Sequence, residues 1–300
     1  MASTTTTPKV WLITGASSGL GREIARRALG QGDIVFATAR NPARIPEVLT
    51  SYTETCVAET FDVTSPDAVL AETVSRIVSH PKNVTGRIDI VVNAAGYVLA
   101  GGCEEVSGEE ALAQFNTNVL GQLSVGRAVL PVLRAQKAGI LANFGSILSY
   151  LGPAGAGLYS ATKAACSILS EALTGEVKHL GVQVTCIEPG YFRTSVLDQG
   201  HMLHPAKKID ELRGENGSQE MATTLAMWEA ANNKQPGDPA KLADVVVDAL
   251  SGNGVYAGRT LPARLLIGKD AYGIWAAVQE KQRKQMEEWR AECTGTDFTE

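Results

Sequence analysis

The chain has 300 residues, 44% hydrophobic and 20% charged, which suits one large α/β domain or two small ones. Its net charge of -5 gives no general attraction to nucleic acid or to an anionic membrane, so any anionic ligand must be held by local chemistry. No apolar run reaches transmembrane length and residues 1–8 lack the apolar core of a secretion signal, so we expect a cytoplasmic protein with a short disordered segment before residue 9.

The first predicted unit is a strand, a glycine loop and a helix. Residues 10–14 (VWLIT) form an apolar run that suits a buried parallel strand. The loop from Gly15 to Gly21 has the spacing G-x3-G-x-G, and Leu20 begins a helical apolar pattern. Free N–H groups at a helix N-terminus, beside closely approaching glycines, can bind the pyrophosphate of a dinucleotide. A purely structural turn is the alternative.

The second strand, predicted at residues 33–39, should end at the residue that contacts the adenosine ribose. A carboxylate there would bind a 2′-hydroxyl, but Ala39 and then Arg40 occupy the place. A guanidinium can bind a 2′-phosphate with two hydrogen bonds. The pattern therefore favours NADP(H) over NAD(H), with a surface arginine that merely caps the strand as the alternative.

Asp62 ends the third predicted strand, residues 55–63. Its carboxylate suits a hydrogen bond from the adenine amino group, or the N-cap of a helix predicted over residues 67–78. The local pattern favours the capping role, for which Ser65 competes.

A fourth strand, residues 88–92, opens into the small-residue loop 93–96 (NAAG). Such a loop allows close approach to a ligand, and Asn93 is expected to fix it through side-chain hydrogen bonds. A long helix follows over residues 109–135, with Asn118 in its middle. Asparagine is a poor helix former, so a partner or a role is expected for it.

Residues 141–146 form the fifth predicted strand and carry Ser146 at its end. Tyr159 and Lys163 are four residues apart and share one face of a helix. An ammonium beside a phenol favours the phenolate, which would make Tyr159 a general acid or base. The intervening glycine-rich and alanine-rich loop can bring Ser146 back toward the phenol. Tyrosine–lysine pairs at this spacing also occur without catalysis.

A sixth strand at residues 182–187 precedes Pro189 and Gly190, after which residues 191–236 lose strand character. Long segments of this kind often form lids or binding loops, and this one contains Met202 and Trp228. We expect it to set substrate specificity.

The C-terminal part is predicted to contain a helix at 241–250, a strand within 262–268 and a charged amphipathic helix at 271–290. Mixed acids and bases favour a solvated helix over the sheet edge rather than a membrane-binding helix. The tail from Cys293 is expected to be disordered.

No metal site or disulfide framework is predicted. The cysteines are odd in number and scattered without a CxxC pair, which indicates reduced intracellular thiols (Cys56, Cys103, Cys166, Cys186 and Cys293). Cys166 is interpreted as an apolar filler, and His201 and His204 as loop histidines without a third ligand.

Taken together, these motifs resemble the classical short-chain dehydrogenase/reductase family over residues 9–260. The matching segments are TGASSGLG at 14–21, Asp62-Val63, NAAG at 93–96, Asn118, Ser146, YSATK at 159–163 and Pro189-Gly190. Ala94 and Gly145 depart from the usual asparagine and serine, and neither change removes a reacting group. The segments ATAR and LPARLLIGKDAYG are most similar to the 17β-hydroxysteroid dehydrogenase branch.

The resemblance implies an α/β fold: a single Rossmann-type, doubly wound parallel sheet of about seven strands with helices on both faces. The Rossmann domain would span residues 9–268, with a substrate-loop insertion at about 191–236 and a C-terminal helix and tail at 269–300. It also implies a homodimer or homotetramer, formed through the Asn118 helix and the helix after Tyr159.

The resemblance also implies the roles of individual residues. Ser146 would orient a substrate carbonyl, Tyr159 would donate the proton, Lys163 would bind the nicotinamide ribose, and Asn118 would hold a water. Thr194 would bind the nicotinamide carboxamide. The full set implied for cofactor binding is Gly15, Ser17, Ser18, Gly19, Leu20, Arg40, Asp62, Val63, Asn93, Ala94, Gly96, Tyr159, Lys163, Pro189, Gly190 and Thr194.

We therefore expect an NADP(H)-dependent oxidoreductase that interconverts a ketone or aldehyde and an alcohol. The methionines of the 191–236 segment suit a lipophilic carbonyl substrate. Two alternatives stay open. One is an isomerase, epimerase or other acid/base enzyme that uses the same site, and the other is a non-catalytic NADP-binding regulator. Presence of all four catalytic side chains argues against the regulator.

Overall fold

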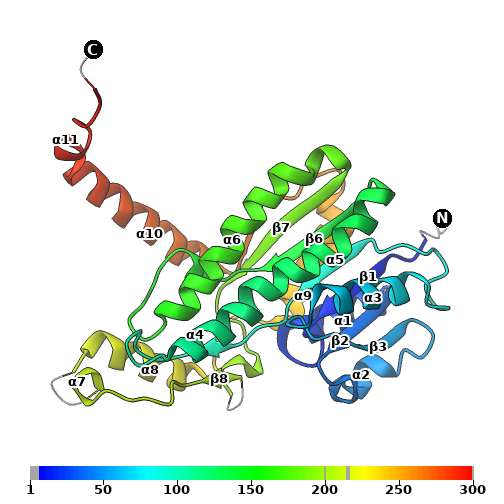
Figure 1. The fold of residues 1–300 in the computed structure, drawn as a ribbon, viewed down its shortest axis with the longest axis horizontal. Coiled ribbons are helices and arrows are strands. Elements are labelled where there is room, and N and C mark those ends of the chain that lie inside the picture. The colour runs from blue at the N-terminus through cyan, green and yellow to red at the C-terminus, as the bar shows by residue number, and fades with distance from the viewer. Residues whose placement is uncertain (1–6, 199–200, 214–216, 299–300) are drawn as a thin grey trace.

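Seven parallel strands form the central sheet of the computed structural model, which describes residues 7–198, 201–213 and 217–298 (Figure 1). The strand order is β3-β2-β1-β4-β6-β7-β9, as expected for a doubly wound α/β fold. The strands are β1 (Val10–Thr14), β2 (Ile34–Ala39), β3 (Cys56–Thr60), β4 (Ile90–Asn93), β6 (Gly139–Phe144), β7 (Val182–Pro189) and β9 (Arg264–Ile267). Of the expected lead before residue 9, residues 1–6 lie outside the described part.

Helices cover both faces of the sheet, which is why its strands are apolar without alternation. Trp11 and Ile13 of β1 belong to a core shared with α1 (Gly19–Gly30), α2 (Glu47–Thr50) and α9 (Pro239–Ser251). Val10 and Leu12 belong to the opposite core, shared with α3 (Asp67–Val78), α5 (Gly121–Gln136) and the end of α6 (Gly157–Val177).

The chain reverses its direction of winding at β1, which pairs with β2 on one side and with β4 on the other. In open parallel sheets, ligands bind outside the carboxyl ends of the strands at this switch point. The loops that follow β1 and β4 meet there, and they are the glycine loop and the loop 93–96.

The third strand is shorter than predicted, and the predicted helix cap is wrong. After Thr60 the chain turns, because Asp62 Oδ1 accepts hydrogen bonds from the backbone N–H and the hydroxyl of Thr64 at 2.9 and 2.8 Å. Pro66 occupies the N-cap of α3, and no side chain caps that helix. Neither Asp62 nor Ser65 therefore has the capping role.

Two further strand ends also differ from the prediction. β4 begins at Ile90 and includes Asn93, and β6 ends at Phe144. Ser146 therefore lies two residues beyond its strand, at the start of a short 3-10 turn η3 (Ile147–Ser149).

The long helix predicted over residues 109–135 is one helical run interrupted by a π turn. It consists of α4 (Gly108–Phe115), the π-helical η2 (Asn116–Leu120) and α5. The N–H of Gly121 bonds to the carbonyl of Asn116, five residues back, and Asn118 is buried within this turn. Single π turns inside helices are frequent at functional sites.

Residues 191–236 form a lobe beside one end of the sheet (Figure 1). The expectation that this segment lacks strands is wrong in one respect, because β8 (Met202–Leu203) pairs in parallel with β5 (Val98–Leu99). The helices of the lobe are α7 (Asp210–Arg213) and α8 (Gln219–Ala231).

The last long helix, α10 (Lys269–Glu288), points away from the sheet instead of lying over its edge (Figure 1). Ala271, in its first turn, is the buried residue of this helix, and the many charges beyond it favour solvent. A short helix α11 (Arg290–Cys293) follows, so the predicted disordered tail begins in a helical turn. No helix of the described ranges is long and apolar enough to cross a membrane.

Candidate active site

Tyr159 and Lys163 lie together in the first turns of α6, as their spacing predicts. The ammonium nitrogen of Lys163 is 5.7 Å from the centre of the Tyr159 ring and donates a hydrogen bond of 2.9 Å to the carbonyl of Phe144. Lys163 is buried, yet no carboxylate of residues 7–198, 201–213 or 217–298 pairs with it. A buried ammonium needs more partners than one carbonyl, so its remaining N–H groups are available to a ligand.

The hydroxyl of Ser146 is held with its proton free. Its oxygen accepts a hydrogen bond of 3.1 Å from the N–H of Leu148, and its own N–H donates to the Ser149 hydroxyl at 3.2 Å. Within the described residues the hydroxyl proton of Ser146 has no acceptor. The side chain is therefore fixed by an accepted bond and can donate to a substrate oxygen.

A buried carboxylate, Glu188, stands behind this serine loop. The Ser149 and Ser167 hydroxyls are 2.9 Å apart, and Ser167 donates to Glu188 at 2.5 Å. The Tyr150 hydroxyl donates to the other Glu188 oxygen at 2.5 Å. An ionised carboxylate only accepts, so each hydroxyl in this chain points its proton toward Glu188. That direction leaves the Ser149 oxygen free to accept from the N–H of Ser146.

The electrostatics of this cluster are dominated by burial. Burial raises the pKa of Glu188, which its hydrogen bonds with Ser167 and Tyr150 oppose, and its nearest cation is Arg264 at 3.7 Å. Burial and the bond to Glu188 raise the pKa of Tyr150 to about 12. Sequence reasoning missed Glu188. The available signal was a single carboxylate in the otherwise apolar run that ends β7.

The amide of Asn118 connects the π turn η2 to the loop at Tyr97 and to α6 through hydrogen bonds. Its oxygen accepts from the N–H of Tyr97 at 3.1 Å, while its nitrogen donates to the carbonyl of Tyr97 at 3.0 Å and to the Thr162 hydroxyl at 3.2 Å. A side chain added at Gly96 would lie 3.1 Å from the Asn118 oxygen and 3.9 Å from the Lys163 nitrogen. Asn118 therefore lies beside Lys163, and the role of holding a water stays a prediction.

Gly15 and Gly21 of the glycine loop are packed too tightly to accept a side chain. A Cβ added at Gly15, where φ is +66°, would lie 2.8 Å from the N of Ala95, and one added at Gly21 would lie 2.6 Å from the carbonyl of Gly15. The N–H of Ala16 donates to the carbonyl of Thr38 at 3.0 Å, which ties the loop to the end of β2. The loop thus presents backbone at the switch point.

Several predicted cofactor residues around this loop have free polar groups. Ser18 is the N-cap of α1 but makes no capping hydrogen bond, and Ser17 and Leu20 are half-buried beside it. Arg40 is exposed two residues after Thr38, and no described side chain pairs with it. These groups are therefore available to an anionic ligand.

The loops that follow β3 and β4 pack against neighbouring glycines and side chains. The Ala94 Cβ is 3.2 Å from a Cβ placed at Gly21, and Val63 packs against Gly121. Asn93 does not fix its own loop as predicted, because its amide donates to the Asn143 side chain at 2.9 Å and to the carbonyl of Gln122 at 3.3 Å.

The segment after β7 passes close to the glycine loop. A Cβ added at Gly19 would lie 3.8 Å from the Cβ of Thr194, and Thr194 caps the turn η5 (Ser195–Leu197). Gly190, which follows Pro189, has no room for a side chain because the Asp270 carboxylate occupies the place of its Cβ. Thr194 therefore lies beside the glycine loop, and its role in binding the nicotinamide carboxamide stays a prediction.

An apolar cluster surrounds Tyr159 on the side of the 191–236 lobe. The residues that Tyr159 shares it with come from four parts of the chain, namely β5, η3, the lobe and α10: Val98, Ile147, Tyr191, Met202, Trp228 and Ile274. Burial raises the pKa of Tyr191, and the Trp228 indole N–H is buried without a hydrogen bond in the described structure. The cluster suits a lipophilic ligand with a small polar part.

A buried ion pair anchors the lobe. Glu105 has no exposed side-chain surface, and both its oxygens bond to the Arg213 guanidinium, through Nε and, at 2.6 Å, Nη2. It also accepts from the N–H groups of Gly102 and Ile209, and the Arg213 bonds lower its pKa to about 2. His201 and His204 bond to backbone carbonyls of Ser195 and Ala100, and the described residues contain no cluster of metal ligands.

Comparison with known proteins agrees with this geometry. A sequence model of the short chain dehydrogenase family matches residues 9–201. The oxidoreductase BOA17 of Botryotinia fuckeliana (strain B05.10) is 32% identical, covering 94% of this chain and 97% of its own. A 3-ketodihydrosphingosine reductase of Bacteroides thetaiotaomicron is 36% identical, covering 70% of this chain and 71% of its own. The structure of a short-chain dehydrogenase from Streptomyces avermitilis has a TM-score of 0.84 at 34% identity, covering 97% of this chain and 100% of its own. The chain belongs to the short chain dehydrogenase family.

Proposed function

We propose that the protein is an NADP(H)-dependent oxidoreductase that interconverts a ketone or aldehyde and an alcohol. The observation that carries this proposal is that two adjoining segments near the glycine loop, residues 144–149 and the start of α6, supply a free serine proton, a phenol and a buried ammonium. Ser146, Tyr159 and Lys163 supply these groups. The relatives support the reaction class, since two are named as an oxidoreductase and a keto reductase.

The residues present fit a nicotinamide dinucleotide. Gly15 and Gly21 let the loop pack closely on itself and on Ala95, while Gly19, at the N-terminus of α1, has only Thr194 nearby and leaves space for a pyrophosphate. The unpaired Arg40 suits a 2′-phosphate, which favours NADP(H) over NAD(H). The two N–H groups of Lys163 that Phe144 does not use suit ribose hydroxyls. When bound, the cofactor supplies or accepts the hydride.

The protein's own part is to position the carbonyl and to move one proton. The Ser146 hydroxyl donates to the carbonyl oxygen, and Tyr159 donates a second hydrogen bond that becomes proton transfer as negative charge develops there. The buried ammonium of Lys163 stabilises the resulting phenolate. In the oxidative direction the same phenolate removes the proton from the alcohol.

The apolar cluster around Tyr159 supports a lipophilic substrate. Tyr191, Met202 and Trp228 all come from the 191–236 lobe, so the lobe would cover one side of the substrate. The unpaired indole N–H of Trp228 can bind one further acceptor on the substrate.

The test is NADPH oxidation at 340 nm across a panel of aliphatic, aromatic and polycyclic ketones and aldehydes, with NADH run in parallel and products identified by mass spectrometry. We expect alcohol formation equimolar with NADPH loss, and a preference for apolar substrates. Product formation without net NADPH loss would instead indicate an isomerase. Tight NADPH binding without any product across the panel would indicate a regulator.

A further inference from the structure

The face of α10 that packs on the body continues uncovered along the rest of the helix. Ala271 is buried, and Ile274 packs against the apolar cluster around Tyr159. Beyond them Trp275 and Val278, three residues apart, fall on the same stripe, and Trp289 follows eleven residues after Val278 with Gln282 and Gln285 between them. Trp275 is 38% exposed and Trp289 is 63% exposed. An apolar stripe of this kind, on a helix that projects into solvent, needs a covering surface (Figure 1).

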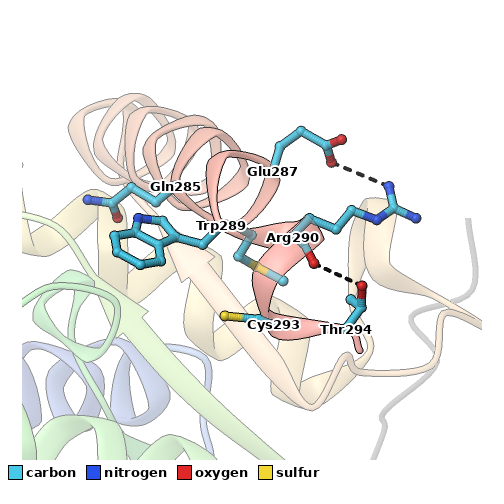
Figure 2. Close-up of a pocket in the computed structure, with 7 residues that line it drawn as sticks. Gln285, Glu287, Trp289, Arg290, Cys293 and Thr294 are labelled. Carbon is cyan, nitrogen blue, oxygen red and sulfur yellow. Dashed lines mark hydrogen bonds and ion pairs between the residues drawn. The ribbon is translucent and has the colours of Figure 1, made fainter. Parts of the chain in front are cut away.

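The end of the stripe is hollowed. An open surface hollow of about 620 Å³ lies at the junction of α10 and α11, and the exposed side chains of Met286, Trp289 and Cys293 line it. Figure 2 shows Gln285, Trp289 and Cys293 on one side of this junction, with Glu287 and Arg290 on the other. The hollow has room for a large side chain of a partner.

The charges of α10 divide into a paired set and an unpaired set. Glu280 pairs with Arg283 and Lys284 within the helix, and Glu287 pairs with Arg290. Lys281 and Glu288 make no ion pair with any residue of the described ranges. They are seven residues apart, so they lie on the same flank of the apolar stripe.

We propose that α10 pairs antiparallel with α10 of a second copy of this chain. In an antiparallel pair the same flank of both helices meets, so Lys281 lies opposite Glu288 of the second copy, and the reverse pair forms as well. A parallel pair would place Lys281 opposite the other flank, where Gln279 and Met286 lie, and both charges would stay unpaired.

The core of the antiparallel pair is equally complementary. With these charges matched, Val278 lies near Trp289 of the second copy, and Gln282 lies near Gln285, where two amides can bond to each other. Residues 280–292 carry four basic and four acidic side chains, so the stripe has no net charge to attract an anionic membrane or a strongly charged protein. The second copy is the occupant that the charges favour. The proposal does not depend on the reaction catalysed.

The test is sedimentation velocity over a concentration series with the full-length chain. The variants are Lys281→Glu and Glu288→Lys, each of which places like charges at both crossing points, and Lys284→Glu is the matched control on the solvent face. We expect Lys281→Glu and Glu288→Lys each to weaken self-association about tenfold or more, because two attractions become repulsions. An equimolar mixture of these two variants should restore wild-type association, and Lys284→Glu should behave as the wild type.

Circular dichroism at 222 nm establishes that the variants keep their helices. Any association through another surface contributes equally to the wild type and to all variants. The differences in sedimentation between these proteins therefore report on α10. The proposal is wrong if Lys281→Glu and Lys284→Glu sediment alike, or if mixing the two charge variants does not restore association. Equal behaviour of every sample would show that a second copy does not cover this face.

Discussion

At the level of single residues, the group that holds the Ser146 hydroxyl in place does not occupy the proton that this hydroxyl can donate. Ser146 accepts a hydrogen bond from the N–H of Leu148, so its position is set without use of its proton. The Ser146 N–H donates to the Ser149 hydroxyl, which contacts the Ser167 hydroxyl, and Ser167 donates to Glu188. When ionised, the Glu188 carboxylate only accepts hydrogen bonds. In the proposed reaction, Glu188 would thereby orient the Ser146 hydroxyl from behind the serine loop, without contact to the substrate.

We therefore predict that Glu188→Gln lowers kcat. An amide can accept from Tyr150 or Ser167 but not from both, and one unmade buried bond costs about 1–3 kcal/mol. We expect kcat to fall about tenfold while KM for NADPH stays unchanged. Glu171→Gln is the matched control, because Glu171 is a half-exposed partner of the same Arg264 and lies outside the chain to Ser146. A lower thermal midpoint with unchanged kcat would show that Glu188 only stabilises the fold.

Arg40 carries the prediction of cofactor preference. Loss of a charge-assisted bond to a 2′-phosphate costs about 1.5–3 kcal/mol, so Arg40→Ala should raise KM for NADPH by roughly 10- to 100-fold. KM for NADH should not change. Arg26→Ala, on the exposed face of α1, should leave both values as they were. Equal effects of Arg40→Ala on the two cofactors would contradict the role of Arg40.

Spacing in the sequence was sufficient to place Lys163 beside Tyr159, because residues four apart on a helix share one face. The catalytic roles of Ser146, Tyr159 and Lys163 stay predictions. Spacing was insufficient for Glu188 and Asn93. Whether a buried polar side chain bonds to its own loop or to a neighbouring strand depends on the packing of elements distant in sequence. Asn93 bonds to Asn143, 50 residues away.

At the scale of elements, the 191–236 lobe is held by Glu105 and Arg213, which bridge the loop before α4 and the end of α7. The folded protein lowers the pKa of Glu105 from 4.5 to about 2. The ion pair therefore stabilises the folded state fully above pH 4.5, and this contribution is lost as the pH falls toward 2.

We predict that Glu105→Gln reduces the stability of the protein at neutral pH but much less near pH 3. Urea unfolding at pH 7, 5 and 3, with tryptophan fluorescence as the signal, gives the difference between wild type and variant at each pH. Glu104→Gln is the control, since Glu104 is exposed next to Glu105. A difference that is constant with pH would show that the charge of Glu105 does not contribute.

Apolar runs in the sequence predict most strands of the sheet and most of the helices that cover it. They do not predict the residues at which these elements begin and end. β3 stops where Asp62 bonds back to Thr64, a competition between a local turn and the strand that the apolar pattern does not reveal. The course of α10 was also mispredicted. Its amphipathic pattern indicates that one face of the helix is covered. The pattern does not identify the surface that covers it.

At the scale of the whole molecule, the outer surface of α5 and α6 supports the expected homo-oligomer. Ile168 on α6 and Leu120 before α5 are exposed by 57% and 44%, next to a smooth stretch of small residues. We predict that Ile168→Glu lowers the molecular mass measured by light scattering, whereas Glu176→Ala does not. An unchanged mass would place any subunit interface elsewhere.

We propose that Tyr159 donates the proton when a carbonyl is reduced. Single-turnover NADPH oxidation by Tyr159→Phe, together with fluorescence titration of NADPH binding, tests this role. We predict that the variant binds NADPH as tightly as the wild type and reduces a ketone at least about 100-fold more slowly. Turnover at the wild-type rate by a variant that lacks this hydroxyl would contradict the account.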